Sequence, residues 1–179
     1  MRDGPFPHWI DDGLGEVILR DDGRYDLVFR RLIAKPVDRV WAALTIPERL
    51  ADWFARVDLE LRVGGRYHVH FDDHGYSVEG EIVELEPLRR LVHTWPDPDP
   101  SRPAAIVSYD LETQGDGCVL ILANRGVPPE YASAVAGWHA FLEALPGAVE
   151  GVRTPWSMDR ETEIRTRYEH LLPPATGAA

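Results

Sequence analysis

Apolar and polar residues alternate along the middle of the chain, from Val57 to Arg125, with the period of two that is typical of half-buried strands. Short turns such as Gly64-Gly65 and Gly115-Asp116-Gly117 interrupt the pattern. The predicted strands, including an earlier pair joined at Asp22-Gly23, are 16–20, 25–34, 57–61, 67–71, 76–86, 91–95, 105–112 and 119–125. Because short turns join consecutive strands, we predict an antiparallel meander rather than a parallel sheet.

A change of period after Lys35 predicts two short helices in succession. Val40, Trp41 and Leu44 lie at helical spacing, and Pro36 is a residue that helices tolerate in their first turn. The second helix is expected to begin near Ile46 and to continue through the apolar residues Leu50, Trp53 and Phe54. Two short helices directly after a strand form an unusual and therefore informative arrangement.

The last third of the chain predicts two more helices. The first is expected to begin at 128–130, to carry an apolar stripe, and to bend or end at Pro146-Gly147. Its stripe consists of Val135, Trp138, Leu142 and Leu145, with Phe141 beside them. The second, at about 159–172, presents Ile164, Tyr168 and Leu171 on one face, which must be buried by intramolecular docking or in a homodimer.

The order of these elements predicts an α+β fold in which a curved antiparallel sheet wraps around one long helix. Such an arrangement encloses a volume between the sheet and the helix. That volume is either filled by side chains or left as a ligand cavity, and the sequence pattern leaves both alternatives open.

Composition and charge narrow the functional classes. The chain has 179 residues, 44% of them hydrophobic and 27% charged, and its net charge is −11. An acidic surface repels phosphate groups, so we expect no nucleic-acid partner and no docking to anionic membranes. Cys118 is the single cysteine, which excludes an internal disulfide and a cysteine metal cluster. With no signal peptide or spanning segment evident, we expect a cytoplasmic protein.

Several segments, all in register, resemble the helix-grip (START-like, SRPBCC) superfamily, in the branch named for activators of the heat-shock-protein-90 ATPase. The segments that carry the resemblance are 30–45, 47–54, Leu61-Arg62-Val63-Gly64-Gly65-Arg66, Gly80-Glu81-Ile82-Val83-Glu84-Leu85-Glu86-Pro87, 90–95 and Gly137-Trp138. The resemblance implies a helix-grip domain over residues 25–150. Residues 1–24 would then form an N-terminal extension with a leading hairpin strand, and 151–179 a C-terminal helical tail.

The resemblance also implies a function, namely binding of a small apolar or aromatic molecule between the sheet and the long helix. It gives a chaperone-associated interaction module, active in stress responses with a heat-shock-protein-90 partner, as an alternative. Neither interpretation calls for a cofactor, a metal ion or a catalytic residue.

Strand parity identifies the candidate binding residues. Polar side chains expected on the inward face are His93, Tyr109 and Asn124. Aromatic residues expected to form the cavity wall or ordinary core are Trp53, Phe54, Tyr67, Phe71, Trp95, Trp138 and Phe141. Relatives often have His where this chain has Asn124, whose amide can orient a ligand hydroxyl or carbonyl but cannot carry a proton.

A third interpretation is an enzyme, a cyclase or hydrolase that acts on an aromatic substrate with His93 as the general base. His93 can equally be a core histidine with satisfied hydrogen bonds. The pairs His68/His70 and Glu79/Glu81 have spacings that metals or acid–base chemistry can use, but parity places them on the solvent face. Cys118 is expected to be a buried thiol.

Overall fold

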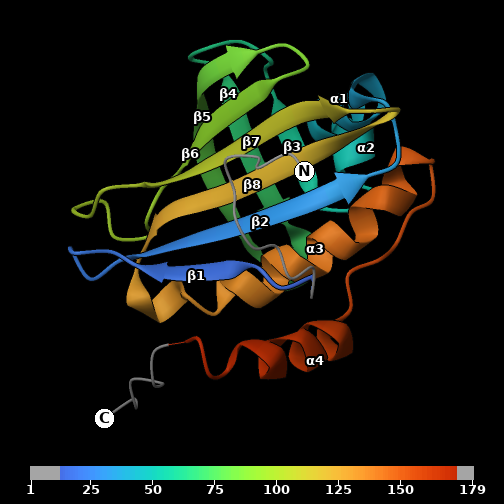
Figure 1. Ribbon diagram of the computed structural model, residues 1–179. Coiled ribbons are helices and arrows are strands. Elements are labelled where there is room, and N and C mark those ends of the chain that lie inside the picture. The colour runs from blue at the N-terminus through green and yellow to red at the C-terminus, as the bar shows by residue number, and fades with distance from the viewer. Residues whose placement is uncertain (1–12, 173–179) are drawn as a thin grey trace.

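A computed structural model of the chain describes residues 13–172 and contains one eight-stranded antiparallel sheet. The strand order is β1-β2-β8-β7-β6-β5-β4-β3, and the sheet curves along this order (Figure 1). The strands are β1 (Glu16–Leu19), β2 (Tyr25–Ile33), β3 (Arg56–Leu59), β4 (Arg66–Phe71), β5 (Tyr76–Glu86), β6 (Arg90–Trp95), β7 (Ala105–Gln114) and β8 (Gly117–Val127). β3 to β8 form the predicted meander, and β2 pairs with the last strand.

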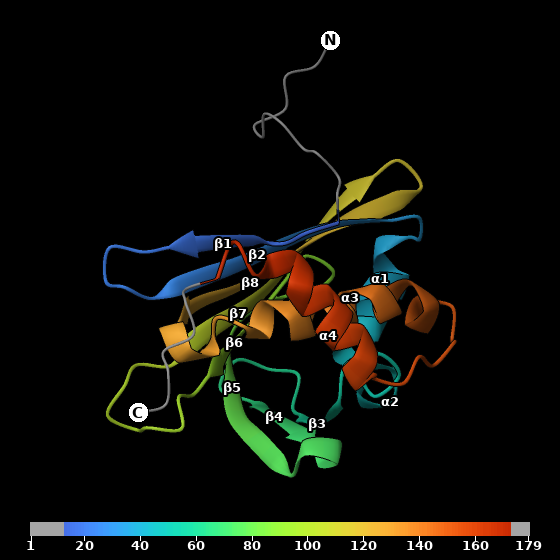
Figure 2. The same ribbon diagram turned by 90° about the horizontal axis from the view of Figure 1, so that it is seen from below.

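The helices confirm the predicted α+β, helix-grip architecture. They are α1 (Val37–Thr45), α2 (Pro47–Leu50), α3 (Ala134–Val149) and α4 (Met158–Tyr168), with 3-10 turns at η1 (Asp72–His74) and η2 (Pro129–Tyr131). Figure 2 shows α3 between the β1–β2–β8 part and the β3–β4–β5 part of the curved sheet. α3 therefore occupies the concave side, as the apolar stripe of its sequence predicts.

The alternation of residues along the strands predicts the sides of the sheet correctly. On β4, Tyr67 and Val69 are fully buried, whereas His68 and His70 are partly exposed. Nε2 of His70 lies at hydrogen-bond distance, 2.9 Å, from Oδ2 of Asp58 on the paired strand β3. The H-x-H pair therefore lies on the outer face.

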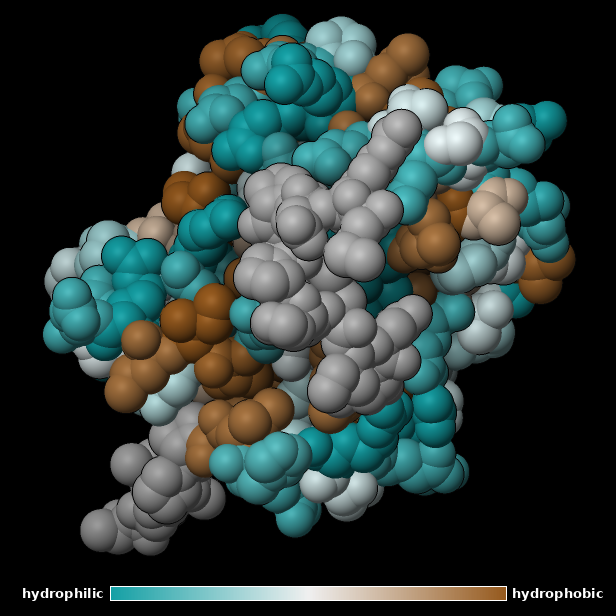
Figure 3. Space-filling view, in the orientation of Figure 1, coloured by the Kyte–Doolittle hydropathy of each residue, from teal (hydrophilic) through white to brown (hydrophobic). Residues whose placement is uncertain are grey.

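The outer face is mostly polar but exposes some apolar side chains, such as Leu32 on β2 and Val83 on β5, and the edge strand β1 also exposes apolar residues. Ile18 and Leu19 on β1 are 44% and 62% exposed. Figure 3 shows an apolar patch over β1, while much of the remaining visible surface is hydrophilic.

Four helix boundaries differ from those predicted, and backbone chemistry accounts for two of them. The long helix begins at Ala134 rather than at 128–130, because Pro128 and Pro129 lack amide protons and the chain first closes the 3-10 turn η2. The same helix continues through Pro146 to Val149. Because Pro146 lies in the last turn, it removes only one hydrogen bond there and the helix can continue past it. The second short helix ends at Leu50 rather than near Phe54, and the last helix ends at Tyr168 rather than near Leu172.

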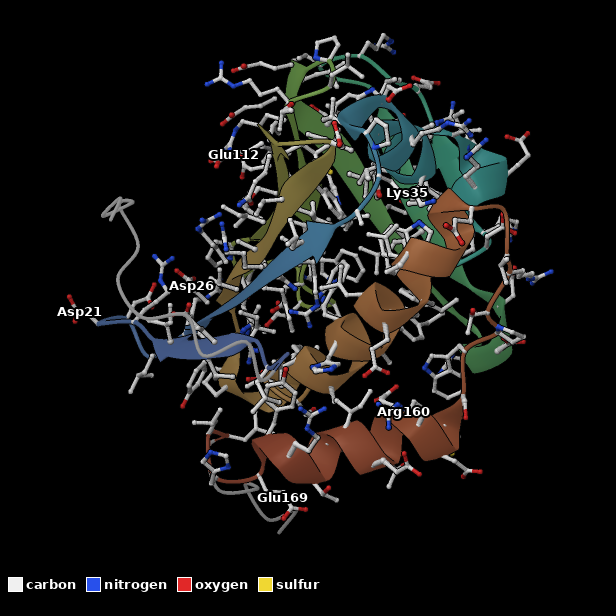
Figure 4. All side chains as sticks on the ribbon, turned by 45° about the vertical axis from the view of Figure 1, so that its right-hand side comes forward. Asp21, Asp26, Lys35, Glu112, Arg160 and Glu169 are labelled. Atoms are coloured by element: carbon white, nitrogen blue, oxygen red, sulfur yellow. The ribbon has the colours of Figure 1, made fainter. Side chains whose placement is uncertain are left out.

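The C-terminal helix α4 packs against α3 of its own chain. Ile164 and Tyr168 are fully buried, so these two residues of the predicted stripe are covered within the chain, whereas Leu171 is 38% exposed. Arg160 points from α4 toward α3, where its guanidinium binds the Glu143 carboxylate at 2.7 and 2.8 Å (Figure 4). The structure thus shows the intramolecular docking alternative, and homodimerisation stays a prediction.

A buried hydrogen-bond network ties α4 to both α3 and the N-terminal strand region. The Tyr168 hydroxyl accepts from the Gly15 amide at 2.6 Å and lies 2.7 Å from Nδ1 of His139. Nε2 of His139 faces the Glu143 carboxylate, which only accepts, so in the neutral ring Nε2 carries the proton and Tyr168 donates to Nδ1. One hydroxyl therefore satisfies two buried partners.

We predict that Tyr168→Phe lowers the free energy of unfolding by about 1–3 kcal/mol, because it leaves the Gly15 amide and His139 Nδ1 without a partner. Urea denaturation measures the change. Tyr131→Phe, which removes the hydroxyl of a side chain that is 44% exposed, is the matched control and is expected to change stability by less than about 0.5 kcal/mol. Equal effects of the two substitutions would contradict the assigned network.

Candidate functional site

A pocket of about 690 Å³ opens where several strands end beside the first turns of α3. Its walls come from the start of β5 and β7, the end of β6 and β8, and the segment that leads into α3. The lining residues include Tyr76, Val78, Glu79, Trp95, Asp97, Ala105, Asn124, Val127, Tyr131, Ala134 and Trp138. The volume lies in the range of small-molecule sites, and most of these side chains are apolar or aromatic.

Trp95 and Trp138 form the partition between this pocket and its neighbour. Their ring centroids are 5.7 Å apart with an interplanar angle of 60°. Both also line a second pocket of about 200 Å³, together with Phe54, Phe71 and Phe141. Trp95 from β6 and Trp138 from α3 therefore join the sheet to the helix at the edge of the larger pocket.

The aromatic residues behind this partition pack on one another. Phe54 stacks on Trp138 with centroids 5.3 Å apart and meets Phe141 edge-on at 5.1 Å. The ring centroid of Phe71 lies 6.2 Å from the ring centroids of both Trp95 and Phe141. Trp53 is held differently, since its indole Nε1 donates to the Ala43 carbonyl at 2.9 Å and fixes the corner between α1 and α2.

Asn124 is the buried polar residue in the wall of the larger pocket. It lies on the inward face of β8, between Leu27 of β2 and Val107 of β7 in the ladder, and is 4% exposed. Its amide oxygen Oδ1 has no hydrogen-bond partner among residues 13–172. An unpartnered buried carbonyl oxygen is costly, and it leaves an acceptor available to a ligand.

Tyr67, His93 and Tyr109 form a packed layer next to the pocket. The Tyr67 and His93 rings stack with centroids 3.8 Å apart, and Tyr109 lies 5.9 Å from His93. The stack spans β5 at Gly80, where a Cβ would come within 2.4 Å of the Thr94 carbonyl oxygen and 2.9 Å of that of Tyr67. Glycine is thus required for β4 and β6 to bring their rings together.

All three residues of this layer are neutral at physiological pH. Burial lowers the pKa of His93 to about 4, and the contact of Nδ1 with the Thr94 carbonyl at 3.0 Å opposes this only in part. Burial raises the pKa of the Tyr67 and Tyr109 hydroxyls, so both stay protonated. A histidine with such a low pKa is a weak general base near pH 7, and this disfavours the catalytic interpretation of His93.

The structure separates the sequence-predicted residues into three groups. Trp95, Asn124 and Trp138 line the larger pocket. Trp53, Phe54, Phe71 and Phe141 line a further pocket of about 400 Å³, on the other side of the aromatic partition. The remaining three, Tyr67, His93 and Tyr109, line none of the pockets described here, so parity places them on the correct face but does not give their depth.

Several lining residues are not predicted from the sequence. Ala105, Val127 and Tyr131 line the larger pocket from strand ends and from the 3-10 turn before α3. The Pro128-Pro129 pair is the sequence signal for the turn before α3. Nothing local in the sequence shows that this turn lies beside the end of β6 and the start of β7. That proximity depends on the sheet topology.

Other chemical candidates keep structural roles in the described part of the chain. Glu79 and Glu81 are exposed, as predicted, and Cys118 is fully buried. Among residues 13–172, no three His, Cys, Asp or Glu side chains are grouped so that they could hold a metal ion. Within the same residues, no helix is long and apolar enough to cross a membrane.

The open curved sheet around a long helix, with a pocket at one end of the seam, defines a domain of the helix-grip class, a fold that supports ligand binding in general. Residues 34–150 match the family described as activator of Hsp90 ATPase homolog 1-like protein. The match covers more than half of the chain, and the chain belongs to this family.

Solved structures support the same assignment. The chain is 27% identical to CalU16 from Micromonospora echinospora, with a TM-score of 0.70 over 88% of this chain and 97% of that protein. Protein MLL2253 from Mesorhizobium loti is also 27% identical, with a TM-score of 0.64 over 72% and 99% of the two chains. DynU16, a protein in the dynemicin biosynthetic locus, is 28% identical with a TM-score of 0.63 over 74% of this chain and 51% of its own. No functionally curated protein is significantly similar to the chain.

We predict that acidification from pH 7 to pH 5 destabilises the protein partly through His93. Its pKa is about 4 in the folded state and about 6.5 when unfolded, so between these values the unfolded chain binds one more proton and stability falls as the pH falls. Protonation of His93 in the unfolded chain therefore lowers the free energy of unfolding by about 2 kcal/mol between pH 7 and pH 5.

Urea denaturation at several pH values between 5 and 7, on the wild type and on His93→Gln, measures the effect. The variant lacks the ionisable ring, and its dependence of unfolding free energy on pH should be weaker by roughly one proton. Carboxylates contribute equally to both proteins. Parallel pH profiles for the two proteins would show that His93 is not a buried neutral group.

Proposed function

We propose that this protein binds a small apolar or aromatic molecule in the pocket between the end of the sheet and α3, with no catalytic residue assigned. The observation that carries the proposal is a pocket of about 690 Å³ walled by Trp95 and Trp138, with the buried acceptor of Asn124 in its wall. Such a combination of aromatic walls with a few convergent polar groups is typical of small-molecule sites.

The division of the chain supports this proposal. We assign the binding domain to residues 25–150, which contain every residue that lines the pocket. Residues 1–24 are assigned as an extension and 151–179 as a helical tail. The tail does not line this pocket, although its Trp156 and Arg153 line the pocket of about 400 Å³ on the opposite side of the aromatic partition.

One structural neighbour comes from a biosynthetic locus. DynU16 is described as a protein in the dynemicin biosynthetic locus, and its fold is shared by this chain. A domain that holds an aromatic small molecule is a useful component for such a biosynthetic setting. DynU16 supports the proposal only through its shared fold and its biosynthetic locus. The class of ligand is inferred from the residues that line the pocket.

We predict that the neutral apolar dye Nile red binds the wild-type protein and that Trp95→Ala weakens this binding roughly tenfold or more, because an aromatic wall is lost. Fluorescence titration measures the affinity. The matched control is Trp156→Ala, since Trp156 lines neighbouring pockets but not this one, and it should bind the dye as the wild type does.

Native mass spectrometry of gently purified protein provides an independent readout, because a bound endogenous molecule adds a discrete mass. The proposal fails if the wild-type protein carries no ligand and binds no apolar probe. An equal loss of dye binding in Trp95→Ala and Trp156→Ala would place the site elsewhere.

A further inference from the structure

The pocket wall and the layer behind it contain a group of buried polar atoms with no hydrogen-bond partner among residues 13–172. The clearest cases are Asn124 Oδ1 and His93 Nε2, since the Tyr67 and Tyr109 hydroxyls interact with each other and Asp97 Oδ2 lies 4.0 Å from Arg102. Buried polar atoms in folded proteins are almost always paired, and each exception calls for an explanation such as a ligand or a water molecule. Of these two atoms, Asn124 Oδ1 belongs to a residue that lines the pocket, where a bound molecule can supply the missing partner.

His93 and Asn124 belong to β6 and β8, the two strands that flank β7 on the concave face. His93 of β6 pairs with Val107 of β7, which in turn pairs with Asn124 of β8, so His93 and Asn124 flank Val107 in one cross-strand row. Trp95, two residues beyond His93 on the same face, has its ring centroid 6.2 Å from that of His93 and lines the pocket with Asn124. Trp95 and Asn124 therefore line the pocket, and His93 lies deeper in the core, next to Trp95 on β6 and in the same row as Asn124.

The hydrogen-bonding character of two of these atoms follows from their chemistry. The Asn124 oxygen is an amide carbonyl and only accepts. Nδ1 of His93 faces the Thr94 carbonyl, which also only accepts, so the neutral ring carries its proton on Nδ1. Nε2 of His93 is then a bare acceptor. Asn124 Oδ1 and His93 Nε2 are thus both acceptors.

The carboxylates that line the pocket are acidic, and the nearby cation Arg102 is engaged with Asp97 and Glu130. These carboxylates belong to Glu79, which is exposed, and Asp97, whose carboxylate is 4.0 Å from Arg102. Asn124 itself is neutral, and the layer behind it carries no charge at neutral pH. An anionic ligand group placed against Asn124 Oδ1 would lose its hydration and face an oxygen that cannot donate to it.

We propose that the ligand is an aromatic molecule that carries a hydroxyl group, that this hydroxyl donates its proton to Asn124 Oδ1, and that aromatic carboxylates are rejected. This inference rests on the proposed function, because it names the ligand class of the same pocket. Trp95 and Trp138 contact the aromatic ring of the ligand, and Asn124 Oδ1 accepts the hydrogen bond from its hydroxyl.

The test uses three probes of nearly the same shape with the full-length protein: 2-naphthol, 2-methoxynaphthalene and 2-naphthoate. Isothermal titration calorimetry at pH 7 gives the affinities. We expect 2-naphthol to bind about tenfold more tightly than 2-methoxynaphthalene, which cannot donate, and 2-naphthoate to show no binding over the same concentration range.

Asn124→Leu has nearly the same shape as the wild-type residue but lacks the acceptor, so the preference for 2-naphthol over 2-methoxynaphthalene should disappear while the methoxy compound still binds. Asn124→Ala serves the same purpose with a smaller side chain if the leucine variant does not fold. Their circular dichroism spectra and thermal melts confirm the fold before titration.

The outcomes separate this inference from the proposed function. Equal binding of 2-naphthol and 2-methoxynaphthalene, or binding of 2-naphthoate, overturns the ligand class and leaves the pocket as an apolar site. A preference for 2-naphthol that survives in both Asn124 variants overturns the role of Asn124. Failure of all three probes and of Nile red overturns the ligand class and the proposed function together.

Discussion

The packing of α3 against the concave face of the sheet determines where the protein has room for another molecule. Large side chains such as Leu142 and Leu145 are buried in the core along the second half of α3. Near its start, small residues face the seam, since Ala134 on the helix and Ala105 on β7 both line the pocket. The pocket opens where these two small side chains line the seam between the sheet and the helix.

The aromatic partition converts this opening into a defined site. Trp95 and Trp138 belong to the sheet and the helix respectively, and Phe54 stacks behind Trp138. Each ring is positioned by others, so the wall of the pocket is an extension of the core rather than a surface loop. A rigid wall of this kind favours flat ligands, because such ligands can lie against aromatic faces without a rearrangement of the fold.

Much of the fold is predictable from the sequence, whereas the depth of each residue is not. Alternation along 67–71 separates buried Tyr67 and Val69 from His68 and His70, because a strand has only two faces. The same rule assigns His93 and Asn124 to the inward face but cannot show that only Asn124 lines the larger pocket. That difference depends on which strands end beside α3, and so on long-range pairing such as that of β2 with β8.

The two buried histidines show that the protein can satisfy an imidazole fully when stability is the requirement. His139 has partners for both ring nitrogens, Tyr168 and Glu143, and this network docks α4. His93 is more deeply enclosed, yet among the described residues only its Nδ1 has a partner. Both have a pKa near 4, so burial alone does not distinguish them. Among residues 13–172, Asn124, at the other end of the cross-strand row from His93, is the unpaired group that lines the pocket, and an unpaired acceptor in a pocket wall is a destabilising feature that a binding site explains.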